Sequence, residues 1–255
     1  MFFSGIFFLF TACTNPPMLE GSVTDIWNKP IADAQVKFEG SDEQPRKTDR
    51  SGKFSFPAKE GKSVFVASKK GYIHTKQNAL FFPEKDPTPS PLEFKLYPEP
   101  KTEGFFAVGA ENYLQIKQEK LRNKASSLKS IRGLQYQQKL TLKSKQASSF
   151  LFHTNLSKEE LKQIGLQLHK LKFIEKAHFK AATGDTEVPI NLWVADTSSS
   201  FIMKSLPQEK MFLIEFKEPL PPGHYAFHTH GVLTSSEKNG TAKDLQIAYP
   251  FQVKK

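Results

Sequence analysis

Three histidines lie close together near the end of the chain, in the segment GHYAFHTHG at residues 223–231. Imidazole nitrogens are common metal ligands, and a His-x-His pair on one strand has a spacing that can hold a zinc ion. Side chains alternate between the two faces of a strand, so His224, His228 and His230 are predicted to share a face. Two interpretations are open: a metal site that uses His228 and His230, or the solvent-facing side of an ordinary strand.

The local sequence favours the second interpretation. Residues 221–223 (Pro-Pro-Gly) predict a turn, so a strand should begin near His224 and place Tyr225 and Phe227 on the opposite face. Burial of aromatic side chains contributes most to stability, so the aromatic face is expected in the core and the histidine face in solvent. At roughly 3.3 Å per residue, His224 would lie about 13 Å from His228, too far to share an ion on a regular strand.

The rest of the chain supplies no further ligand set and no catalytic motif. His153, His169 and His178 lie in separate segments with no ligand spacing. The motifs H-E-x-x-H, G-x-S-x-G and G-x-G-x-x-G are absent, as are a P-loop and an EF-hand loop. Asp185 and Glu187 lie in the polar segment ATGDTE and are interpreted as solvated loop acids. We therefore expect no catalytic residue, no metal and no cofactor, and hence a protein that is not an enzyme.

The composition predicts an all-β fold. The 255 residues include 23 Phe, 17 Pro and 14 Gly, and aromatic residues suit strands while Pro and Gly suit turns. Short apolar segments separated by regular turn signals are typical of β-sandwiches. We expect two β-sandwich domains in tandem, at residues 18–98 and 103–255, joined by a Pro-rich linker. The second domain should contain a short helix at about 157–164, because Ser157 and Glu160 have the capping-box spacing.

The chain opens with the apolar leader MFFSGIFFLFTAC, which ends in its single cysteine. The run of apolar residues is too short to cross a bilayer, which needs about 20 residues, but it fits the hydrophobic region of a secretory signal. With small residues before Cys13, the leader resembles the lipobox of bacterial lipoproteins, although Phe10 stands where that pattern has Leu. The resemblance implies a signal peptide at 1–12, acylation of Cys13 and a lipid anchor, with Thr14 favouring the outer membrane. The other interpretation is a buried N-terminal strand or helix with a free thiol.

Residues 18–98 carry a spaced set of turn and strand residues. The set consists of Gly21, Val23, Asp25, Pro30, Ile31, Ala34 and Val36, then Thr48, Asp49, Gly52 and Phe54, then Gly71 and Tyr72. It resembles the carboxypeptidase regulatory-like domain, a transthyretin-like β-sandwich, with Asn28 where that family has a turn glycine. Asn accepts the positive φ that such a turn requires. The resemblance implies a sandwich fold and no catalytic residue, because its motifs are structural.

Positive charge is concentrated in residues 115–146, which hold nine basic residues and one acidic residue, in a chain of net charge +10. One interpretation is a binding surface for lipid headgroups or an acidic polymer. Its candidate contacts are Lys117, Lys120, Arg122 and Lys124. The other interpretation is the solvated face of strands with a polar loop. Nucleic acid is not expected, because an aromatic stacking platform is missing from this stretch.

Together these features predict a non-catalytic lipoprotein of the bacterial cell envelope. It would scaffold or bind another envelope component, either a protein or an anionic polymer, and would reach the membrane through its lipid anchor. The alternative is a metal-binding protein or metalloenzyme that uses His228 and His230.

Overall fold

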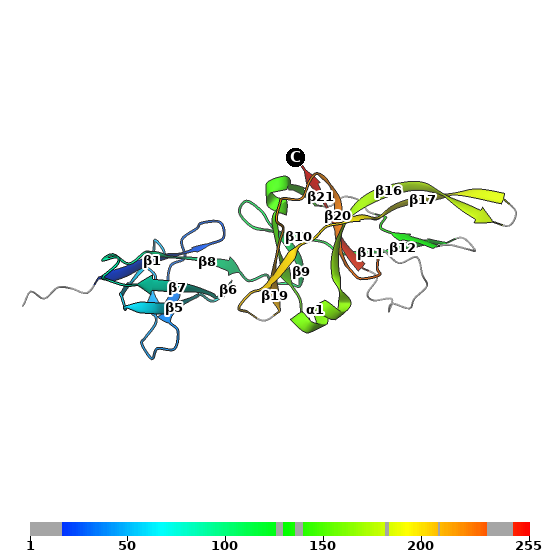
Figure 1. The fold of residues 1–255 in the computed structure, drawn as a ribbon. Helices are drawn as coiled ribbons and strands as arrows, with labels where there is room; N and C mark the ends of the chain where they lie inside the picture. Colours follow the sequence, from blue (N-terminus) through cyan, green and yellow to red (C-terminus); the bar gives the residue numbers. More distant parts are fainter. Residues whose placement is uncertain (1–16, 126–129, 136–139, 182–183, 209, 234–246) are drawn as a thin grey trace, which may run out of the picture. The chain divides into compact units, whose positions relative to one another are not determined.

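The structure is a computed structural model that describes residues 17–125, 130–135, 140–181, 184–208, 210–233 and 247–255 (Figure 1). The chain divides into two compact units, Met1–Glu99 and Pro100–Lys255. Each unit has a hydrophobic core of its own. Within the described ranges, no helix combines the length and the apolar character needed to cross a bilayer.

Unit 1 consists of short strands in two sheets. The strands are β1 (Met18–Asp25), β2 (Gln35–Phe38), β3 (Arg46–Lys47), β4 (Lys53–Pro57), β5 (Gly61–Ser68), β6 (Tyr72–Ile73), β7 (Thr75–Phe81) and β8 (Leu92–Pro98). One sheet has the order β4-β1-β8-β6 and the other has the order β3-β2-β5-β7. β1 and β8 pair in parallel, whereas β1 pairs antiparallel with β4.

Alternation along these strands builds the core of unit 1. Phe54 and Phe56 of β4 are buried, as are Leu92, Phe94 and Leu96 of β8, and each set shares a face because its members alternate along the strand. Both sheets contribute to one apolar cluster of Leu19, Val23, Ile31, Ala34, Val36, Phe54, Phe56, Phe65, Ala67, Ala79, Leu92, Phe94 and Leu96. The two sheets therefore form a sandwich around this cluster.

The turn after β1 is held by a buried carboxylate. Asp25 Oδ1 accepts the backbone N–H of Trp27 at 2.8 Å and that of Lys29 at 2.9 Å. The enclosed Asn28 has a φ of 63°, so the positive φ expected at this position is confirmed.

A buried threonine holds the next connection. The Thr48 hydroxyl donates to the carbonyl oxygen of Ile31 at 2.6 Å and accepts the backbone N–H of Ala34 at 2.9 Å. Gly52 has a φ of 75°, and a Cβ there would lie 2.5 Å from the Val23 carbonyl oxygen. The spaced residues seen in the sequence thus make turns and close backbone approaches.

Unit 2 is larger and also mostly β. Its elements are β9 (Gly104–Val108), β10 (Tyr113–Ile116), β11 (Glu119–Lys120), β12 (Arg122–Ala125), β13 (Ser130–Gly133), β14 (Thr141–Lys143), the 3₁₀ turn η1 (Ser144–Ala147), β15 (Ser149–His153), α1 (Lys158–Ile164), β16 (Leu166–Ala181), β17 (Gly184–Ser198), β18 (Ile202–Ser205), β19 (Met211–Glu215), β20 (Gly223–Thr229) and β21 (Ile247–Lys254). One sheet has the order β10-β9-β15-β19-β18. The other has the order β11-β21-β20-β16-β17, with β14 also beside β21.

The two sheets of unit 2 enclose an aromatic core. Phe105 and Phe150 from the first sheet meet Tyr225, Phe227 and Phe251 from the second, and all five are at most 1% exposed. β20 and β21 pair antiparallel in the middle of the second sheet. The all-β prediction is confirmed, with sandwich-like sheets in both units.

Helix α1 begins and ends as its sequence predicts. The Ser157 side chain accepts the backbone N–H of Glu160 at 3.2 Å, and the Glu160 carboxylate accepts the Ser157 backbone N–H at 2.7 Å. Gly165 has a φ of 62° and ends the helix with a left-handed cap. Leu161 turns its side chain into the core.

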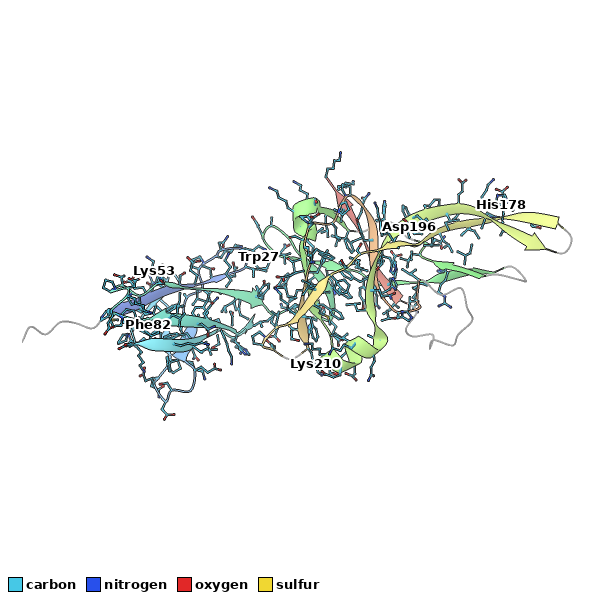
Figure 2. The ribbon with its side chains drawn as sticks, viewed as in Figure 1. Trp27, Lys53, Phe82, His178, Asp196 and Lys210 are labelled. Carbon is cyan, nitrogen blue, oxygen red and sulfur yellow. The ribbon has the colours of Figure 1, made fainter. Side chains whose placement is uncertain are left out.

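The hairpin of β16 and β17 extends beyond the strands that pair with it (Figure 1). Residues 166–171 of β16 pair with β20, while residues 169–181 pair with β17. His178 lies in the outer part of this hairpin and Asp196 nearer its base (Figure 2). The register shifts between Ile174 and Lys176, where Pro189 lies opposite Lys176.

Candidate functional site

Strand β20 carries buried side chains on both of its faces. Tyr225 and Phe227 face the main core and are 1% and 0% exposed, as predicted. His228 on the opposite face is only 2% exposed, so the prediction that the histidine face lies in solvent is wrong at His228, whereas His230 is exposed as predicted and His224 is partly buried. A second apolar cluster covers this face, formed by Leu121, Leu134, Leu171, Ala226, Val232, Leu233 and Ala248. Most of these residues lie outside the strand, so the strand's own alternation gives no sign of the second layer.

His169 and His228 form a buried pair across neighbouring strands. They are diagonal neighbours, because Ala226 lies opposite His169 in the pairing of β16 with β20. His169 Nδ1 and His228 Nε2 are 2.8 Å apart, and the ring centroids are 4.9 Å apart. His228 Nδ1 lies 2.8 Å from the Thr229 carbonyl oxygen, which only accepts, so Nδ1 donates. In the neutral ring His228 Nε2 then accepts, and His169 Nδ1 donates to it.

Burial keeps this pair neutral. Burial lowers the pKa of His228 to about 4; the hydrogen bond to the Thr229 carbonyl opposes this shift, and neighbouring His169 and His230 add to it. Burial also lowers the pKa of His169. Two neutral imidazoles that hydrogen-bond each other satisfy their polar atoms on an otherwise apolar face. The pair therefore has a structural role in the second layer.

The side chains of the other two histidines of the segment, His224 and His230, contact residues outside the buried pair. The ring centroid of His224 lies 4.1 Å from that of Trp193. His230 Nδ1 lies 3.1 Å from Gln167 Nε2. Across the part of the chain that the structure describes, no three His, Cys, Asp or Glu side chains are grouped so that they could hold a metal ion. Because both ring nitrogens of His228 are already hydrogen-bonded, His228 and His230 do not form the start of a metal site.

A cavity of about 140 Å³ lies between the two sheets of unit 2, beside His228. Its apolar lining residues are Phe105, Phe152, Leu156, Leu161, Ile164, Leu166, Ile247 and Tyr249. Phe105 stacks on Phe152 with 4.1 Å between centroids and meets Tyr249 edge-on at 4.7 Å. Both sheets and helix α1 contribute to these walls, so the cavity is a built feature of the unit 2 core. We call it the unit 2 pocket.

Polar groups also line the unit 2 pocket, among them Glu103, His153 and Thr154. The Glu103 carboxylate accepts the backbone N–H of Asn155 at 3.2 Å and a hydrogen bond from the Asn155 side-chain amide. A carboxylate has about four lone-pair sites, so these two bonds leave acceptor capacity free. His153 Nδ1 lies 3.0 Å from the Thr102 carbonyl oxygen and must donate to it, so Nε2 of the neutral ring is an acceptor.

The one side chain of fixed charge among the described residues that line the unit 2 pocket is acidic. Glu103 is the single carboxylate of the pocket, and neither lysine nor arginine is among the described residues that line it. Burial and the nearby Glu103 charge together raise the pKa of the Tyr249 phenol, which stays protonated at neutral pH. A concave, mostly apolar space with a few polar groups at its edge is the usual form of a small-molecule site. The arrangement can bind an apolar group that carries hydrogen-bond donors.

The predicted anionic-partner contacts lie on consecutive elements of unit 2. Lys117 follows β10, Lys120 is in β11 and Arg122 begins β12, and all three are exposed. Within the described ranges none of them has a carboxylate at ion-pair distance. The side chain of Lys124 falls outside the described part of the structure, as does Cys13. Anionic binding and acylation at these residues therefore stay predictions.

The unit 2 pocket could not be predicted from the order of residues alone. Its lining residues come from residues 103–105, 152–166, 228–229 and 247–249, which only strand pairing brings together. The pairing of His169 with His228 was missed for the same reason. The one local signal at the pocket is the capping box of α1, which correctly predicted the helix that closes one side.

No protein-family model and no curated protein matches this chain. Several solved structures show a distant likeness. A protein from Bacteroides uniformis, provisionally assigned as carbohydrate-binding, is 8% identical with a TM-score of 0.24, over 85% of this chain and 89% of its own. A DUF3823 family protein from Parabacteroides merdae is 10% identical with a TM-score of 0.23, over 94% of this chain and 100% of its own. BcpA, the major pilin subunit of Bacillus cereus, is 14% identical with a TM-score of 0.21, over 93% of this chain and 68% of its own.

Proposed function

We propose that this chain is a non-catalytic lipoprotein of the bacterial cell envelope that binds another envelope component through the unit 2 pocket. The observation that carries the binding function is the cavity of about 140 Å³ between two rigid sheets, lined by aromatic and aliphatic side chains with polar groups at its edge. Such a site holds a ligand without requiring a change in the fold.

The membrane anchor in this proposal is supported by the sequence. An apolar leader ends directly at Cys13, the single cysteine of the chain. Acylation at this residue would attach several acyl chains, and several chains hold a protein at a membrane stably where one binds only marginally.

A second, weaker contact is proposed for the basic residues Lys117, Lys120, Arg122 and Lys124. The first three are exposed and have no acidic partner among the described residues. Exposed cations of this kind attract anionic headgroups and acidic polymers, and salt screens the attraction over about 8–10 Å at physiological ionic strength. This contact would add to the anchor and to the pocket.

The anchor is tested by metabolic labelling with a clickable palmitate, followed by membrane fractionation. The wild-type chain should be labelled and should sediment with membranes, whereas Cys13→Ser should be unlabelled and soluble. Equal labelling of the two chains would contradict the anchor.

The pocket is tested by ligand-observed NMR of the purified Cys13→Ser chain with a set of monocyclic aromatic fragments. At least one fragment should bind, and Ile164→Phe, which fills the cavity from helix α1, should remove that binding while unfolding remains cooperative. Identical spectra from both proteins would show that the cavity is not the binding site.

A further inference from the structure

We infer that the unit 2 pocket selects an aryl amine, that is, one aromatic ring carrying a protonated amine on a short link. This inference rests on the proposed binding function and names the class of ligand. It comes from the size of the cavity, the sign of its charge and the hydrogen-bonding state of its edge.

The size of the cavity sets the apolar part of the ligand. An engineered protein cavity of about 150 Å³ lined by Leu, Ile and Phe binds benzene. The unit 2 pocket, at about 140 Å³, has walls of the same chemistry. It therefore has room for one six-membered ring.

The charge at the edge sets the sign of the polar part. The whole chain has a net charge of +10, yet the described residues that line the pocket include the carboxylate of Glu103 and neither lysine nor arginine. A carboxylate ligand would meet like charge here, whereas an ammonium would be attracted.

The hydrogen-bond acceptors at the edge of the unit 2 pocket also favour an ammonium group. The Glu103 carboxylate keeps free acceptor sites after its two bonds from Asn155. His153 Nδ1 is committed to the Thr102 carbonyl, which makes Nε2 of the neutral ring an acceptor. An ammonium has three donors and no acceptor, so it matches an edge of this kind better than a hydroxyl does.

The test is calorimetric titration of the purified Cys13→Ser chain at neutral pH with three probes of one shape: benzylamine, benzyl alcohol and benzoate. Benzylamine should bind about tenfold more tightly than benzyl alcohol, as expected for one charge-assisted hydrogen bond, and benzoate should not bind detectably. Glu103→Gln keeps the shape and removes the charge, so it should weaken benzylamine binding by about tenfold and change benzyl alcohol binding by less than about twofold. Ile164→Phe should remove binding of both.

The outcomes separate the two proposals. Equal binding of all three probes, or a preference for benzoate, would overturn the aryl amine inference and leave the pocket as a binding site. Failure of every probe to bind would overturn both. Thermal unfolding of each variant shows whether it is folded, and if Glu103→Gln is not, the order of the three probes on the Cys13→Ser chain still decides the inference.

Discussion

The buried polar side chains described in the two units find partners at very different distances along the chain. In unit 1, Thr48 bonds to Ile31 and Ala34, 17 and 14 residues away, and Asp25 bonds to backbone groups two and four residues away. In unit 2, His169 and His228 are 59 residues apart. Local partners stabilise single turns, whereas distant partners form only after the sheet has been assembled. The first kind of interaction leaves a pattern in the sequence, and the second does not.

The largest test of this comparison removes one buried ring from each core. Phe54→Ala in unit 1 and Phe227→Ala in unit 2 should each cost about 3–5 kcal/mol, because both delete a buried aromatic side chain. We expect each change to lower the free energy of unfolding of its own unit only. Urea unfolding can follow the units separately, since Trp27 lies in unit 1 and Trp193 in unit 2 and each can be studied with the other replaced by Phe. Transitions that always shift together would contradict independent folding.

The next test uses pH and should affect unit 2 alone. The pKa of His228 is about 4 in the folded chain, below its ordinary value of 6.5, so the unfolded chain binds more protons between these values. Its contribution to stability is present above pH 6.5 and is lost as pH falls toward 4, by up to roughly 3 kcal/mol. His169, whose pKa is also lowered, acts in the same direction. Replacing both histidines by Leu should flatten this part of the stability curve of unit 2. A curve unchanged by the double replacement would show that the pair is not the cause.

The smallest loss of stability is expected on removal of the Thr48 hydroxyl in unit 1. Thr48→Val keeps the shape of the side chain and removes both the donor to Ile31 and the acceptor for Ala34. Leaving these buried backbone groups without partners should cost about 1–3 kcal/mol. Urea unfolding of unit 1 measures the loss, with Thr48→Ser, which keeps the hydroxyl, as the matched control. If the Val variant were as stable as the Ser variant, the Thr48 hydroxyl would not be what stabilises this connection.

Strand alternation and turn chemistry made much of the fold predictable. The inward faces of β4 and β8, the positive φ of Asn28, the caps of α1 and the aromatic face of β20 follow from neighbouring residues alone. Each is decided by the period of a strand, by one turn residue or by one side-chain hydrogen bond within the same element. In each case the interacting residues are close in the sequence, so local backbone geometry sets the distance between them.

The burial of His228 and the formation of the unit 2 pocket depend on segments that are distant in the sequence, so local patterns did not predict them. His228 alternates as a solvent-facing residue would, and it is buried because Leu121, Leu134 and Val232 cover its face. Glu103 and Tyr249 line one cavity although 146 residues separate them in the sequence. No periodic sequence pattern predicts that such distant residues come together, because their contact depends on which strands pair and on which segments pack over the sheet.

The long hairpin of β16 and β17 has a consequence for the solubility of the chain. β17 is the last strand of its sheet, and beyond Trp193, whose backbone pairs with Leu134, an end strand of this kind can offer backbone groups to an extended segment of another molecule. Pro189 lacks a backbone N–H and so cannot donate a hydrogen bond to another strand. The adjacent register shift between Ile174 and Lys176 also bends the hairpin at this point. Lys172 and Lys176 add charge along it, paired with Asp196 and Glu187. The hairpin can therefore project without becoming a template for fibril growth, even where copies are crowded.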